Sequence, residues 1–323
     1  MGGIAEDEYS QKDEREQKTV DENPQPDLFA PVLSSDALMG PFLLTARLFT
    51  TGIFSFYIVN EVIKIHAPNG LFYLAALVQF VGIILVALGY KTRFTALLLA
   101  VCILTSLLFR PSFGLDGYQV TGQKDLAIAG VLLFMFAYGP GPLSLDTYRR
   151  RGKSTKMNES SYDDFFAPVL LNSVVMGPLL FAGRLLSTVV FFIAGSFKTL
   201  HTPVMQAYMV KHNSHVPINL IYLAILTQLV APTLVLLGYK TRYGALALSG
   251  FCIIATVLFH SEFGNPSEVE QFLLDFATAG GFLFMFANGP GPLSLDARLG
   301  RAKRAGEASL TIKTSDVSAA GSR

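Results

Sequence analysis

The chain has 323 residues, of which 51% are hydrophobic and only 15% are charged, and its mean hydropathy is +0.44. A soluble domain carries about 25% charged residues, so this composition argues against a soluble globular protein and favours a polytopic membrane protein. The net charge of +1 gives no basic excess that would attract nucleic acid, and we expect a lipid membrane instead as its surroundings.

The first 27 residues are polar and mostly acidic, and they lack the apolar core of a signal peptide. Such a segment cannot bury enough apolar surface to fold by itself. We therefore expect residues 1–39 to be a disordered tail together with its approach to the membrane.

Eight apolar runs follow, and several reach about twenty residues, the length that a helix needs to cross a bilayer. The fourth run reaches that length only when Asp125 and the residues before it join its helix. The sequence thus predicts an all-α membrane protein with eight transmembrane helices. The runs cover roughly residues 41–65, 71–89, 94–110, 120–138, 178–200, 218–238, 243–260 and 268–288.

The two halves of the chain repeat one another. "FMFAYGPGPLSLD" (134–146) returns as "FMFANGPGPLSLD" (284–296) with twelve of thirteen letters identical, and "LGYKTR" (88–93) returns at 237–242. Each half holds an even number of runs, so both enter the membrane from the same side, as parallel repeats. We expect four-helix repeats over 40–150 and 177–300, a basic and polar linker over 151–176, and a disordered tail over 301–323.

Basic residues indicate the orientation of the spans. In an eight-span arrangement one side carries thirteen of them and the other side five, so the positive-inside rule places both termini in the cytoplasm, with the protein in the cytoplasmic (plasma) membrane. The richer side has Lys91, Arg93, Arg149, Arg150, Arg151, Lys153, Lys156, Lys240, Arg242, Arg298, Arg301, Lys303 and Arg304. The poorer side has Lys64, Arg110, Lys124, Lys198 and Lys211.

The repeated "GPGPLSLD" stretch has two interpretations. Glycine followed by proline ends a helix, and Ser144 with Asp146, or Ser294 with Asp296, can begin a short helix that carries a basic run at the membrane surface. The favoured interpretation is a helix stop with an interfacial anchor, and the alternative is a binding motif.

Four spans ending in G-P-G-x-x-S-L-D, with an early arginine in the first helix (Arg47, Arg184) and "LGYKTR" between the second and third, resemble the DoxX family. The resemblance implies a tandem duplication of a four-helix DoxX-like domain. DoxX-like proteins are similar to the small membrane subunit of thiosulfate:quinone oxidoreductase, and some are linked to thiol or oxidative-stress systems. Others in the wider superfamily act as receptors or assembly chaperones.

This resemblance implies a membrane subunit of a quinone-linked redox system, with non-covalent quinone and a redox partner protein. The alternative is a non-enzymatic carrier, or a chaperone- or receptor-like protein, so whether the chain is an enzyme stays open. In the second half Arg184, Gly195 and Lys198 match the family's arrangement in the first helix, and His260 matches its histidine. We therefore expect one site, in the second half.

Ionisable residues inside spans are costly, and they mark functional sites. Glu61 and Lys198 occupy equivalent positions with opposite charge, so they could pair across the repeat axis, although Lys198 could equally reach toward the outer interface. Along the eighth span, Glu268, Gln271 and Asp275 share one helix face. A solvated helix start accounts for Glu268 equally well, which leaves Asp275 as the candidate.

The expected site has Asp275 and His260 as proton-exchanging groups. Its expected binding residues are Lys198, Arg184, Gln228 and Glu61. A metal site built from His201, His212 and His215 is an alternative with no recognised ligand spacing behind it, so we predict no metal.

Overall fold

The structure is a computed structural model, and every regular element that it describes is an α-helix. Two compact units are distinguished, residues 1–39 and residues 40–323, and the description below concerns the second. Glu61, most of residues 154–171 and most of the two predicted tails lie outside the described residues, although residues 301–304 of the C-terminal tail are described and helical. The residues described are 29, 33, 35, 38–51, 70–108, 120–153, 166, 168–170, 172–212 and 215–304.

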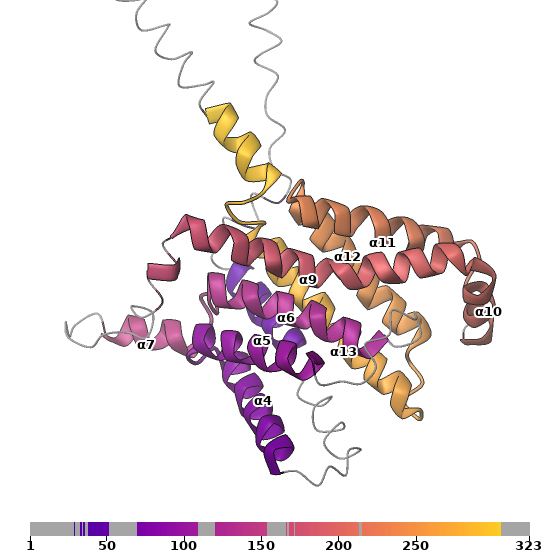
Figure 1. Cartoon of the computed structure of the whole chain (residues 1–323), viewed down its shortest axis with the longest axis horizontal. Coiled ribbons are helices and arrows are strands. Elements are labelled where there is room, and N and C mark those ends of the chain that lie inside the picture. Colours follow the sequence, from indigo (N-terminus) through magenta and orange to yellow (C-terminus); the bar gives the residue numbers. More distant parts are fainter. Residues whose placement is uncertain are drawn as a thin grey trace, which may run out of the picture. The chain divides into compact units, whose positions relative to one another are not determined.

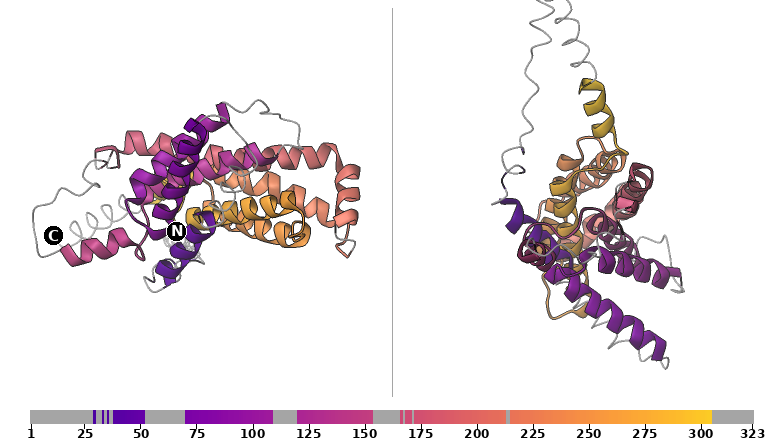
Figure 2. Two further views of the ribbon diagram at one scale, coloured as in Figure 1. Left: turned by 90° about the horizontal axis from the view of Figure 1, so that it is seen from below. Right: turned by 90° about the vertical axis from the view of Figure 1, so that its left-hand side faces the viewer.

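In the first half (40–150), described helix covers residues up to 51, and four labelled helices follow (Figure 1). These are α4 (Gly70–Leu88), α5 (Thr92–Leu108), α6 (Val120–Tyr138) and α7 (Leu145–Lys153). The second half (177–300) contains α9 (Ser173–Leu200), α10 (Thr202–His212), α11 (Leu220–Leu237), α12 (Thr241–Phe259) and α13 (Pro266–Asn288), followed by helix over 295–304. The helix α10 lies between the apolar runs predicted over 178–200 and 218–238, and it leaves the end of α9 at a steep angle (Figures 1 and 2).

Four described helices are long and apolar enough to cross a bilayer, and all four belong to the second half. They cover Val174–Leu200, Leu220–Leu237, Thr241–Phe259 and Glu268–Asn288. They match the last four predicted runs. In the first half, the described apolar stretches Ala76–Leu88 and Thr92–Leu107 are shorter, and the run predicted over 41–65 continues beyond the described residues.

The "LGYKTR" turn closes one helix and opens the next. Gly238 ends α11 with φ of 69°, a left-handed conformation that glycine adopts without steric cost, and Tyr239 N donates to Leu234 O at 3.0 Å. Lys240 then begins α12 with φ of 46° and provides no side-chain cap. The first four N–H groups of α12 therefore need an acceptor from elsewhere in the chain.

That acceptor is the aspartate of "GPGPLSLD". Asp296 accepts from Lys240 N at 2.8 Å and from Thr241 N at 3.1 Å, and its own N–H donates to Gly238 O at 2.8 Å. In the first half Asp146 makes the same bonds to Lys91, Thr92 and Gly89. The two repeated motifs thus form one joint. A serine oxygen also caps each short helix, from Thr147 N to Ser144 and from Ala297 N to Ser294, as the sequence predicted.

Buried arginines complete these joints. Arg47 is 1% exposed and donates to the carbonyl oxygens of Ala87, Pro140 and Leu143 at 3.0, 2.7 and 2.8 Å. Arg184, equally buried, donates to Leu293 O. A buried guanidinium is stable only with such acceptors, so each arginine and the carbonyl oxygens of its "GPGPLSLD" segment depend on one another.

The two halves pack through their first and last helices. A Cβ on Gly130 of α6 would lie 2.5 Å from Gly183 O of α9, and one on Gly280 of α13 would lie 2.6 Å from Ala46 O. The fourth helix of each half therefore touches the backbone of the first helix of the other half. The helices α6 and α9 run side by side in both figures, and α6 also packs on α13. The resulting core includes the middle of α6 and of α13, where most side chains are buried.

Candidate functional site

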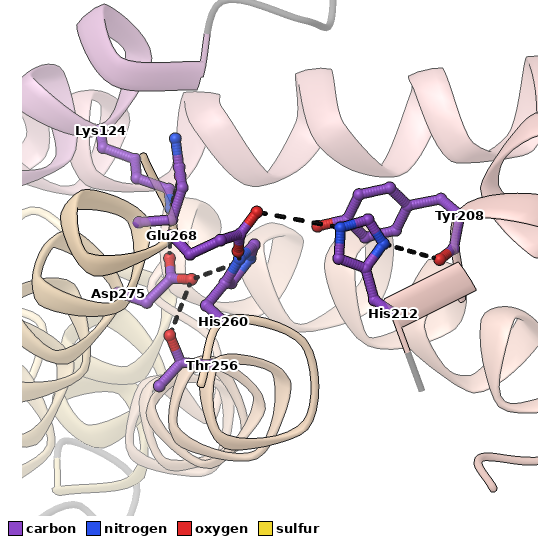
Figure 3. Close-up of polar contacts among 8 residues, drawn as sticks. Lys124, Tyr208, His212, Thr256, His260, Glu268 and Asp275 are labelled. Carbon is purple, nitrogen blue, oxygen red and sulfur yellow. Dashed lines mark hydrogen bonds and ion pairs between the residues drawn. The ribbon is translucent and has the colours of Figure 1, made fainter. Parts of the chain in front are cut away.

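The Asp275 carboxylate, in the first half of α13, is the centre of a group of polar side chains (Figure 3). Its Oδ1 lies 2.8 Å from Lys124 Nζ of α6, and its Oδ2 accepts from Thr256 Oγ1 of α12 at 3.3 Å. Lys124 also donates to Gln271 Oε1, one turn earlier on α13. The first half of the chain thus supplies the cation that balances the proposed acidic residue of the second.

His260 joins this group to a second carboxylate. It directly follows α12, and its Nδ1 lies 2.6 Å from Glu268 Oε2 while its Nε2 lies 4.0 Å from Asp275 Oδ2. Asp275 shares Lys124 with Gln271 and His260 with Glu268, so the three side chains lie on one face of α13, as predicted. The alternative of a merely solvated helix start is wrong for Glu268, whose side chain is 12% exposed and bound to His260.

The helix α10 reaches the same group at its last residue. His212 Nε2 lies 3.9 Å from Glu268 Oε1, its Nδ1 faces the carbonyl oxygen of Tyr208 at 3.0 Å, and the two rings stack with centroids 3.9 Å apart. These contacts hold the imidazole toward α13 (Figure 3).

Lys198 approaches from α9. Its ammonium is within electrostatic range of both Asp275 and Lys124. On the turn before it, Gly195 leaves space for α11, so that a Cβ there would lie 3.2 Å from the Cβ of Gln228. Gln228 is 4% exposed, and its Oε1 is buried with no hydrogen-bond partner among the residues that the structure describes. We call this set the charged cluster: Lys124, Lys198, Thr256, His260, Glu268, Gln271 and Asp275.

Other predicted site residues lie elsewhere. Arg184 is fourteen positions before Lys198 on the same helix, roughly 21 Å along its axis, and it is bound at the "GPGP" joint. The Nδ1 atom of His201 faces the carbonyl oxygen of Phe197, on whose ring it stacks, and His215 is exposed beyond the end of α10. Within the described ranges, no three His, Cys, Asp or Glu side chains are grouped so as to hold a metal ion.

The sequence analysis did not select four members of the charged cluster as site residues: Lys124, Thr256, Glu268 and Gln271. Lys124 was counted as one of the basic residues of the outer side, yet its side chain is only 9% exposed. A signal existed, because Lys124 precedes Asp125, and Leu274 stands at the matching position before Asp275. A lysine that replaces a leucine on a buried helix requires a carboxylate partner.

The arrangement combines two ammonium groups with two carboxylates and an imidazole. Lys124 and Lys198 supply cations, Asp275 and Glu268 supply carboxylates, and His260 lies between the two acids. Such a set can hold a polar molecule and exchange protons with it. The free thiols of Cys102 and Cys252 lie inside α5 and α12.

These features define an all-helical integral membrane protein with a charged cluster among α6, α9, α12 and α13. A sequence model of the DoxX family matches residues 179–261. The inner membrane protein YqjF of Escherichia coli (strain K12) is 32% identical over 118 residues, which are 36% of this chain and 89% of that protein. The chain therefore belongs to the DoxX family. No solved structure matches it.

Proposed function

We propose that this protein is a membrane subunit of a quinone-linked redox system, that it works with a partner protein, and that it binds quinone or a related small amphipathic molecule at the charged cluster. The observation that carries the proposal is the setting of Asp275. Its carboxylate belongs to the candidate span Glu268–Asn288 and has an ammonium at 2.8 Å, with a histidine and a second lysine nearby. Ionisable groups at such depth mark functional sites.

The available groups fit a quinone. Its oxygens accept hydrogen bonds, which Lys198 can donate. The hydroxyls of its reduced form donate, which matches buried Gln228, whose Oε1 has no hydrogen-bond partner in the described ranges. When bound, a quinone couples electron transfer to proton transfer. The residues of the chain orient the head group through Lys198, hold a proton at Asp275 Oδ2 and exchange it with His260. Glu61, outside the described residues, stays a predicted partner of Lys198.

We further infer that the chain is a tandem duplication with eight spans in parallel repeats and both termini in the cytoplasm. The support is the recurrence of equivalent contacts in both halves: the aspartate caps, the arginine joints and the close approaches at Gly130 and Gly280. A relative of which 89% aligns with only 36% of this chain is consistent with that origin.

Mass spectrometry of an organic extract of gently purified protein tests the binding proposal. We expect near-stoichiometric quinone per chain, enriched over the bulk membrane lipids. Lys198→Met removes one charged hydrogen-bond donor, so the occupancy should fall by about tenfold or more. Lys211→Met, on the exposed surface of α10, is the matched control and should leave occupancy unchanged. Absence of quinone where bound lipid is retained would refute the proposal and favour a carrier or receptor.

A further inference from the structure

Basic and acidic side chains alternate along a line from α10 to Asp275 (Figure 3). The distances are 3.9 Å from His212 Nε2 to Glu268 Oε1, 2.6 Å from Glu268 Oε2 to His260 Nδ1, and 4.0 Å from His260 Nε2 to Asp275 Oδ2. We propose that this line is a proton path between the aqueous side of the α12–α13 loop and Asp275. It rests on the proposed function only in taking Asp275 as the group beside the ligand.

His260 is the central carrier, because its two ring nitrogens face two different carboxylates. Protonated Glu268 gives its proton to Nδ1 while Nε2–H gives its proton to Asp275 Oδ2. The step leaves Glu268 as carboxylate, Asp275 as acid and His260 in its other tautomer, so the net change is the transfer of one proton from Glu268 to Asp275 without electron transfer. The 4.0 Å between Nε2 and Oδ2 exceeds hydrogen-bond length, so this transfer requires the Asp275 carboxylate to move toward the imidazole.

The two ends of the line differ in their surroundings. Residues 261–265, between α12 and α13, are exposed, as is His215 after α10, so the outer end meets solvent. At the inner end Asp275 is held by Lys124 and Thr256. A proton path needs this difference, with an exchangeable group outside and a buried acceptor inside.

The charged and titratable groups that form or face the line come from five helices. Among the described residues they are Lys124 of α6, Lys198 of α9, Tyr208 and His212 of α10, Cys252 of α12, and Glu268 and Asp275 of α13.

The equivalent positions of the first half do not repeat the alternation. At the spacing of 150 residues that separates the "GPGPLSLD" motifs, Arg110 stands for His260 and Tyr118 for Glu268, while Asp125 keeps the place of Asp275. Arginine does not give up its proton in proteins, so it cannot pass one on. The aspartate alone recurs, and the carriers belong to the second half, where Lys198 and Gln228 lie.

Time-resolved infrared spectroscopy after a pH jump tests the path on the full-length protein in lipid nanodiscs without added quinone. The carboxylic-acid carbonyl band that disappears in Asp275→Asn reports protonation of Asp275. We expect His260→Gln to slow its appearance by about a hundredfold, the scale of a missing positioned proton carrier, and free imidazole in the buffer to restore part of the rate. Glu268→Gln should slow it as well. His201→Gln, outside the line, is the matched control and should leave the rate unchanged.

Equal rates in the wild type and His260→Gln would overturn the path, and so would the absence of an Asp275 band wherever the protein stays folded. Rescue by imidazole separates a missing carrier from a misfolded variant. The outcome is independent of the quinone test. If the protein carries quinone but His260→Gln leaves the rate unchanged, the proposed function stands and the proton path is refuted. If His260→Gln slows the rate but the protein carries no quinone, the path stands and the proposed function is refuted.

Discussion

The Nζ atom of Lys124 and the Oδ1 atom of Asp275 lie 2.8 Å apart, although one residue belongs to the first half of the chain and the other to the second. Side-chain exposures of 9% and 15% mean that neither charge is well solvated. Each therefore depends on the other, and the charged cluster requires both halves to be folded together.

Replacing Lys124 with methionine should lower the free energy of unfolding by about 3 kcal/mol, because Asp275 is left as a buried charge without its closest cation. The double variant Lys124→Met/Asp275→Leu should recover most of the loss, since an apolar pair of similar volume carries no desolvation cost. Unfolding in mixed detergent micelles measures both. If Lys124→Met costs no more than Lys211→Met on exposed α10, the pair has no structural importance.

The aspartate caps should contribute equally to the free energy of unfolding in the two halves. Asp296→Ala removes the acceptor for two backbone N–H groups at the start of α12, and Asp146→Ala does the same for α5. Each should cost about 1–2 kcal/mol of unfolding free energy, the usual value of a lost helix cap. Asp296→Asn keeps one acceptor oxygen and should cost less than Asp296→Ala in the same titration. Equal losses for alanine and asparagine would contradict the capping role.

The repeated joint accounts for much of what the sequence could predict. Glycine, proline and serine act through local backbone chemistry, so the helix stops at Gly139 and Gly289 and the caps at Ser144 and Ser294 follow from residue type and spacing. The helix that Asp296 caps could not be predicted from residue type and spacing. That aspartate caps a helix far back in the chain, and only the tertiary fold brings the two segments together.

The charged cluster shows the same limit. Asp275 was selected as an ionisable residue inside a predicted span, and His260 because it matches the histidine of the DoxX family. The structure does bring them near Lys198. Lys124 was missed because its importance depends on the packing of α6 against α13, and no pattern within one helix reports such a contact. Arg184 was included because it matches the early arginine of the DoxX family's first helix, and that match did not reveal at which end of α9 its partners lie.

The two arginine joints should respond unequally to lysine. Arg47 donates to three carbonyl oxygens, whereas the Nε and Nη1 atoms of Arg184 have no hydrogen-bond partner in the described part of the chain. A lysine ammonium cannot reproduce a planar fork of donors. At roughly 1.5 kcal/mol for each charged hydrogen bond, Arg47→Lys should cost about 3 kcal/mol and Arg184→Lys clearly less. Unfolding titrations of both variants measure these losses of unfolding free energy. Equal losses would contradict the difference in hydrogen bonding between the two arginines.

Close backbone approach between the halves predicts strong effects from one added methyl group. Gly280→Ala places a Cβ 2.6 Å from Ala46 O, so it should destabilise the protein by about 1–3 kcal/mol, and Gly130→Ala should behave alike. Gly250, within α12, has nothing within 4 Å of such a Cβ. Gly250→Ala should be neutral or stabilising by up to about 1 kcal/mol, because alanine is the better helix former. Thermal unfolding of the three variants separates crowding from helix propensity, and three equal midpoints would refute the contact.

Single cysteines on a background of Cys102→Ser and Cys252→Ser test the proposed topology. Tyr148 and Phe263 are 77% and 64% exposed, and Arg301 is exposed, so cysteines at these positions should react readily. Three candidate spans separate 148 from 263 and one separates 263 from 301, so Phe263→Cys should be labelled by an impermeant maleimide in intact cells. Tyr148→Cys and Arg301→Cys should react only after permeabilisation.

Ser10→Cys tests the first half of the chain. If that half crosses the membrane four times, residue 10 lies on the same side as residue 148, in the cytoplasm. Labelling of Ser10→Cys from outside would mean an odd number of crossings and would remove the parallel-repeat arrangement, because the halves would then enter the membrane from opposite sides.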